Sequence, residues 1–169
     1  MDSSFNSKKF KQVLEYIISK TSCLPNVGKT VIWKILYFVD FDFYELYEQN
    51  FTGENYFKLE HGPAPKHFDQ IIDELIVEGK VKVIETSYGQ YTQTRYIPLI
   101  EPDLSLLNGN ELQYLENEIV KYSHLNATQI SDTSHKDMPY RATEDMKEID
   151  YELVFYRESL TSVREYLDD

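Results

Sequence analysis

The chain has 169 residues, of which 41% are hydrophobic and 14% aromatic, so it can build the core of one domain and is not globally disordered. No apolar run approaches the roughly 20 residues that a membrane-spanning helix requires. The N-terminus lacks a signal-peptide pattern, and the single Cys23 excludes an internal disulfide, so we expect a cytoplasmic protein without membrane contact.

The net charge of -12 is unevenly distributed along the chain. Residues 1–98 carry 11 Lys and Arg against 13 Asp and Glu, whereas residues 99–169 carry 6 against 16. The second part should therefore repel nucleic acid. It could attract a basic protein partner by steering the encounter, or simply keep the protein in solution.

Two apolar segments predict helices at the start of the chain. Phe5–Lys20 has apolar residues on one face at helical spacing, with Asn6 or Ser7 as the N-cap. Residues 28–48 are apolar or aromatic on most faces, which is typical of the central helix of a bundle. The polar exceptions in this second helix are Lys34, Asp40 and Asp42.

The next segments predict a strand, a turn and a third helix. Glu54–Glu60 favours a strand with Phe57 and Leu59 facing inward. The run from His61 to Pro65 predicts a rigid turn, because proline fixes φ and pushes the preceding residue away from helix. Lys66–Glu78 then predicts a helix, which Gly79 is placed to end.

The remainder of the chain predicts a hairpin and further helices. Lys80–Pro98 has the pattern of a β-hairpin with its turn at Tyr88-Gly89-Gln90. Helices are expected at Glu111–Tyr122 and, capped by Asn126, at Ala127–Ser134. Residues 135–143 are expected to be irregular around Pro139. The last segment should become helical from about Glu158.

These elements predict an α+β fold that is mainly α, a helical bundle with a small antiparallel β-hairpin. If Glu54–Glu60 joins the hairpin, the sheet has three strands. We expect a single domain over residues 1–169, with a core of about 5–143 and an acidic C-terminal helical segment at 144–169.

The sequence contains no pattern that points to catalysis. The four histidines lack the local spacing of a zinc site, so a metal would have to be held through the tertiary fold. Cys23 has no catalytic motif around it, and Gly28-Lys29-Thr30 lacks the first glycine of a phosphate-binding loop. We therefore predict no enzyme activity, no catalytic residue, no metal and no cofactor.

Three separate pieces of the chain resemble a known family. They are the run from Lys34 to Asp40, the run from Thr52 to Tyr56, and the run from His61 to Pro65. In this order and spacing they resemble the Panacea domain of SocA-like antitoxins, which also occurs in phage-associated proteins. A fourth piece, Ser134–Tyr140, is similar to a later family segment that ends in Pro-Trp, with Tyr140 in place of the tryptophan. The resemblance covers about residues 29–143.

The resemblance implies a bacterial or phage protein that neutralises a toxin, usually one encoded next to it. Neutralisation would occur by direct binding or by delivery of the toxin to a protease, as is thought for one family member. The motif positions carried over as a pocket or partner surface are Lys34, Tyr37, Tyr56, His61, Gly62, Pro63 and His135. The His61-Gly62-Pro63 turn can equally be read as structural, because glycine and proline shape the entry to a helix.

A second function remains open from the residues alone, that of a winged-helix DNA-binding regulator. Helix Lys66–Glu78 would enter the major groove and hairpin Lys80–Pro98 would be the wing. The helix carries Asp69, Asp73, Glu74 and Glu78 against Lys66, however, and phosphates would repel that charge. DNA binding is therefore the less favoured interpretation.

Overall fold

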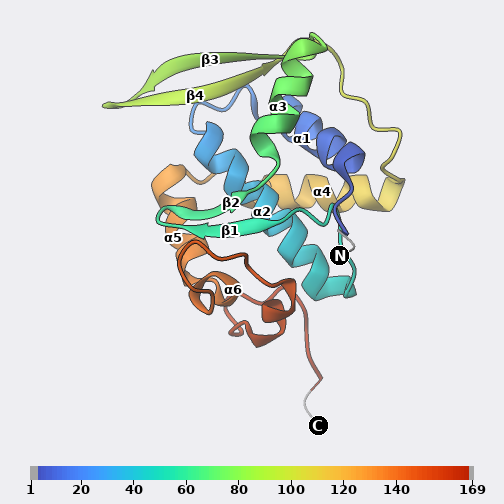
Figure 1. Ribbon diagram of the computed structural model, residues 1–169, viewed down its shortest axis with the longest axis vertical. Coiled ribbons are helices and arrows are strands. Elements are labelled where there is room, and N and C mark those ends of the chain that lie inside the picture. Colours follow the sequence, from blue (N-terminus) through green and yellow to red (C-terminus); the bar gives the residue numbers. More distant parts are fainter. Residues whose placement is uncertain (1–3, 168–169) are drawn as a thin grey trace.

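The computed structural model of this protein describes residues 4–167 and has the predicted α+β, mainly α, fold (Figure 1). The elements in chain order are α1 (Ser7–Thr21), α2 (Lys29–Tyr47), β1 (Tyr56–Leu59), β2 (Gly62–Pro65), α3 (Phe68–Val77), β3 (Val81–Tyr88), β4 (Tyr91–Pro98), α4 (Gly109–Tyr122), α5 (Ala127–Lys136), α6 (Met138–Arg141) and a 3₁₀ helix, η1 (Tyr151–Tyr156).

Helix α2 runs through the centre of the molecule, as its apolar character on most faces predicted (Figure 1). It packs against α1, α4, α5, β2 and η1. The largest fully buried side chains of α1 and α2 meet in this core, and they include Phe10, Leu14, Ile17, Ile35, Leu36 and Phe41. The hairpin of β3 and β4 lies at one end of the molecule, and α6 with the C-terminal segment lies at the other (Figure 1).

The local signals for caps and turns are confirmed. The Asn6 side chain accepts a hydrogen bond from the N–H of Lys9, and Asn126 caps α5 in the same way. Gly79 has a φ of +72° directly after α3, the left-handed conformation that glycine adopts at helix ends. The hairpin of β3 and β4 pairs Val81 with Pro98, as expected.

The β-structure differs from the prediction near the proline turn. Residues Gly62–Pro65 form strand β2, which pairs with β1 in a sheet separate from the β3–β4 hairpin. Pro63 and Pro65 lie opposite Lys58 and Tyr56 of β1. They are tolerated there because the pairing uses N–H groups of their neighbours, such as Lys66 N, which bonds Asn55 O directly before β1 at 2.9 Å. The inward residue of β1 is Tyr56, whereas Phe57 and Leu59 are half-buried.

Two predictions for the C-terminal part are wrong. Residues 135–143 are not irregular, because α5 extends to Lys136 and Met138–Arg141 form α6. No helix begins near Glu158. The 3₁₀ helix η1 comes earlier. Residues 158–167, called the strap below, form one turn at 158–162 and then continue along α2 without regular structure. The main-chain N–H of Val163 donates to Glu45 of α2, so it cannot form the hydrogen bond that a continuing helix would require.

Candidate functional site

Five polar residues of α2 are buried in the core, and their side chains bind segments that are distant in the sequence. They are Lys34, Tyr37, Asp40, Asp42 and Glu45, none more than 2% exposed. Because buried polar groups are costly without partners, their contacts determine how the surrounding segments are held. Three centres result, around Asp40, around Arg157 and around Lys34.

The first centre joins α2 to the loop before β1. The Asp40 carboxylate accepts a hydrogen bond from the Tyr56 hydroxyl at 2.6 Å, and from the main-chain N–H of Thr52 at 2.8 Å and its hydroxyl at 2.7 Å. Burial raises the pKa of Asp40 to about 6, and the hydrogen bonds from Tyr56 and Thr52 oppose that rise. Tyr56, a predicted site residue, is therefore a fully buried donor to this carboxylate.

Glu54 fixes the start of α3 in a similar way. Its side chain is fully buried, and Oε2 accepts the main-chain N–H of His67, the N-cap residue of α3, at 2.8 Å. Oε1 lies 2.6 Å from His67 Nδ1 and also accepts the N–H of Asn55 at 2.8 Å. The chain direction after the proline segment thus depends on this carboxylate.

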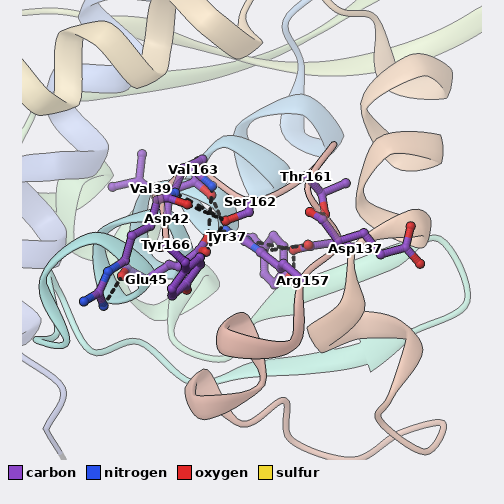
Figure 2. Close-up of polar contacts among 12 residues, drawn as sticks. Tyr37, Val39, Asp42, Glu45, Asp137, Arg157, Thr161, Ser162, Val163 and Tyr166 are labelled. Carbon is purple, nitrogen blue, oxygen red and sulfur yellow. Dashed lines mark hydrogen bonds and ion pairs between the residues drawn. The ribbon is translucent and has the colours of Figure 1, made fainter. Parts of the chain in front are cut away.

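The second centre is a buried guanidinium surrounded by acids (Figure 2). Arg157 Nη1 donates to Asp42 at 2.8 Å and to Glu45 at 3.1 Å. Its Nε and Nη2 donate to the two oxygens of Asp137 at 2.9 and 2.8 Å, and Tyr37 donates its hydroxyl to the same carboxylate at 2.7 Å. Burial alone would lower the pKa of Arg157, but Asp42 and Asp137 raise it well above its ordinary value.

The strap after Arg157 continues along the end of α2, as Figure 2 shows for Ser162, Val163 and Tyr166. The Ser162 hydroxyl, the N–H of Val163 at 3.0 Å and the Tyr166 hydroxyl at 2.9 Å all donate to the Glu45 carboxylate. These bonds hold the strap on α2 as far as Tyr166.

Behind the second centre lies the buried Glu118. Burial, followed by the neighbouring Asp42 carboxylate, raises the pKa of Glu118 to about 11. Tyr122 donates its hydroxyl to Asp42 at 2.8 Å, so α4 is joined to α2 at this point. The centre therefore places the side chains of Asp42, Glu45 and Asp137 around a single guanidinium.

The third centre is a pocket at the N-terminal half of α2. It has a volume of about 350 Å³ and is lined by residues of α2, including Trp33 and Lys34, and by the β1–β2 turn with His61 and Gly62. Lys34 is 2% exposed, and its Nζ donates to the carbonyl oxygen of Pro63 at 3.4 Å. Burial lowers the pKa of Lys34 to about 8.

The profile of the family described as "Antitoxin SocA-like, Panacea domain" matches residues 32–140. The chain belongs to this family. Searches of curated proteins and of solved structures found no match.

The Panacea segment contains all seven motif residues that the sequence singled out, and the structure divides them. Lys34, His61 and Gly62 line one pocket, with Pro63 as the acceptor for Lys34. Tyr37 and Tyr56 are fully buried and belong to the other two centres. They therefore lie inside the core and do not form one surface with the pocket.

The fourth Panacea piece packs beside the pocket. The His135 ring lies 5.0 Å from the Tyr140 ring, between centroids, and its Nε2 is buried without a hydrogen-bond partner among residues 4–167. Tyr140 donates its hydroxyl to the carbonyl oxygen of Leu59, so the residue in place of tryptophan anchors β1. Ser134 of the same piece lies against Gly62, since a Cβ at that glycine would lie 2.9 Å from the Ser134 hydroxyl.

Sequence reasoning missed the acids of the Panacea segment and their cation. Asp42, Glu45 and Asp137 lie within the matched segment, whereas Arg157 lies outside it. The presence of Asp40 and Asp42 in an otherwise apolar helix was the available signal, because buried carboxylates require partners. Nothing local marked Arg157 as that partner.

The described residues contain neither a membrane-spanning helix nor a metal-binding cluster. Among the helices of residues 4–167, none combines the length and apolar character that a bilayer crossing requires. Within the same residues, no group of three or more His, Cys, Asp or Glu side chains is arranged to hold a metal ion.

Proposed function

We propose that this protein is an antitoxin that neutralises a cognate toxin by binding it. It would either inhibit the toxin directly or act as an adaptor that delivers the toxin to a protease. The observation that carries this proposal is the match of residues 32–140 to the family of SocA-like antitoxins. The proposal asks no chemistry of this chain, and the partner would be a protein encoded nearby.

The location of the charges supports an exposed, acidic contact surface for that partner. The buried acids of the Panacea segment already have partners within the chain, so little of their charge is available to bind a toxin. The C-terminal part also has exposed acids, among them Glu144 and Glu165. These charges would steer a basic toxin toward the antitoxin, an effect that salt screens.

Co-expression with the product of the adjacent gene tests the proposal. Growth rescue together with a co-purifying complex supports direct inhibition, whereas rescue with falling toxin levels and no stable complex supports adaptor delivery. If the neighbouring product is harmless, and a pull-down with this protein captures no partner, the antitoxin function is wrong.

The steering surface has its own test within the same experiment. The double variant Glu144→Lys with Glu165→Lys should slow association with the toxin and reduce its salt dependence. Glu85→Lys on the exposed face of β3 is the matched control, because it changes a charge of the same kind at the other end of the molecule.

One observation favours the second function, DNA binding: α3 is followed directly by the β3–β4 hairpin, the order of a winged helix. The charges oppose it. On α3, Asp69, Asp73 and Glu74 are exposed. Arg95 of the hairpin turns inward and donates to the carbonyl oxygen of Leu24 at 3.1 Å. A gel shift at low salt should therefore detect no DNA binding, and a shifted band would revive this function.

A further inference from the structure

Lys34 is a buried cation whose partners are weak. Its Nζ lies 5.8 Å from the centroid of the Trp33 ring, near the outer limit of a cation–π contact. The residue is 2% exposed, and the bond from Nζ to the carbonyl oxygen of Pro63 is long at 3.4 Å. An ammonium group has three donors, and buried lysines are normally paired with acids. Among residues 4–167, no carboxylate offsets the effect of burial on its pKa.

The contrast with Arg157 shows that this protein does pair a buried cation when the cation is structural. Arg157 is also buried, with its side chain 1% exposed, and its guanidinium meets Asp42, Glu45 and Asp137 at 2.8 to 3.1 Å. Lys34 belongs to α2, and Arg157 binds two acids of that helix. The difference is that Arg157 is enclosed by acids, whereas Lys34 lines a pocket.

Gly62 lets the β1–β2 turn pack directly against the Lys34 side chain. Its φ is +122°, and an added Cβ would lie 2.3 Å from Lys34 Cε and 3.0 Å from Nζ. A side chain at this position would therefore occupy the volume next to the ammonium. The β1–β2 turn thus closes one side of the pocket on Lys34, and a side chain at position 62 would displace the ammonium.

The pocket wall combines several donors with one carboxylate, that of Glu60. Trp33 lines the pocket, and its Nε1 is buried with no acceptor within residues 4–167. Lys29 also lines it, lying 5.0 Å from the Trp33 ring centroid and 3.4 Å from the exposed Asp69. At the turn, Glu60 and His61 are both exposed. The wall therefore combines an aromatic face with unsatisfied donors.

We propose that this pocket is a carboxylate-binding site, in which the ligand carboxylate pairs with the Lys34 ammonium and the rest of the ligand lies against Trp33. The carboxylate could come from a small organic acid or from an acidic group on a bound protein. A pocket of about 350 Å³ is of the size that holds small ligands. Only the protein-borne source rests on the proposed antitoxin function.

Trp33 provides the readout, because it is the only tryptophan in the chain. Purified protein would be titrated with acetate, succinate and benzoate while its tryptophan fluorescence is followed, with sodium chloride at equal ionic strength as the salt control. A saturable change is expected with at least one acid. Lys34→Met, which keeps the stem and removes the charge, should weaken that binding at least about tenfold. Lys20→Met, outside the pocket, should leave it unchanged.

The second source is tested with the co-purified complex. If the partner supplies the carboxylate, the free acids no longer alter Trp33 fluorescence in the complex, and Lys34→Met weakens the complex while Lys20→Met does not. The proposal is overturned if the isolated protein responds to none of the acids and Lys34→Met leaves the complex intact. It is also overturned if Lys34→Met binds the acids as tightly as the unmodified chain. Because the titration needs no toxin, failure of the antitoxin function would leave that result unaffected.

Discussion

Arg157 donates to both carboxylate oxygens of Asp137, from Nε at 2.9 Å and from Nη2 at 2.8 Å. This two-pronged contact uses the planar fork of the guanidinium, which a lysine ammonium cannot reproduce. The third nitrogen, Nη1, reaches Asp42 and Glu45 on α2. One side chain therefore joins the residue after η1, the residue between α5 and α6, and the central helix.

Replacing Arg157 with Met should strongly destabilise the protein. The change would leave three acids buried without their cation, which typically costs about 3–5 kcal/mol. The measurement is urea unfolding at pH 7. Arg164→Met is the control, because Arg164 is half-buried and pairs with the exposed Glu48, a contact worth less than about 1 kcal/mol. Equal losses for the two variants would contradict the structural role of Arg157.

Replacing Lys34 with Met should stabilise the free protein, by about 1 kcal/mol or more, since it removes a buried and poorly paired charge. The pH dependence has a definite sign. The pKa of Lys34 falls from 10.5 to about 8 on folding, so between these values the unfolded chain binds more protons and stability rises with pH. The advantage of the variant should therefore shrink from pH 8 to 10.5. Unfolding of both proteins across this range measures the difference, and a constant gap would contradict the prediction.

Replacing Tyr56 with Phe should cost about 1.5–3 kcal/mol at pH 8, the usual value for a hydrogen bond to a charged group. The pKa of Asp40 is about 6 in the folded protein, so the carboxylate is ionised at pH 8 and largely protonated at pH 5. The bond favours the ionised form, and its loss should therefore matter less at pH 5. Tyr44→Phe, which loses a bond to the exposed Glu152, should cost under about 1 kcal/mol at either pH. A pH-independent loss for Tyr56→Phe would argue against an ionised Asp40.

Replacing Gly62 with Ala should be more harmful than replacing Gly79 with Ala. Both have positive φ, at +122° and +72°, so each substitution carries backbone strain of about 1–3 kcal/mol. Only at Gly62 does the new Cβ also collide with Lys34 and Ser134, whereas at Gly79 it would meet no other part of residues 4–167 within 4 Å beyond its own chain neighbours. Thermal unfolding of the two variants should show the larger loss for Gly62→Ala. Similar losses would mean that Lys34 moves aside without cost.

Much of the helical frame follows from local signals. The 3.6-residue periodicity of α1, the apolar surface of α2 and the caps at Asn6 and Asn126 depend on neighbours along the chain. The motif pieces also indicated the family and one side of the Lys34 pocket. Local rules misjudged the segments whose partners are distant. Residues 62–65 became a strand because β1 offers a paired edge, and the segment after Glu158 stayed irregular because Glu45 binds it.

The sequence by itself determined the fold class, the central helix and the family, because periodicity, capping and motif spacing are properties of short stretches. Only the tertiary structure decided which charges belong together. Tyr37 is 100 residues from Asp137, and Arg157 is 115 residues from Asp42. Burial makes these pairings necessary, since a charge removed from water must find a partner. Which partner it finds depends on how the helices pack. That packing places three acids around Arg157, whereas beside Lys34 it leaves a pocket.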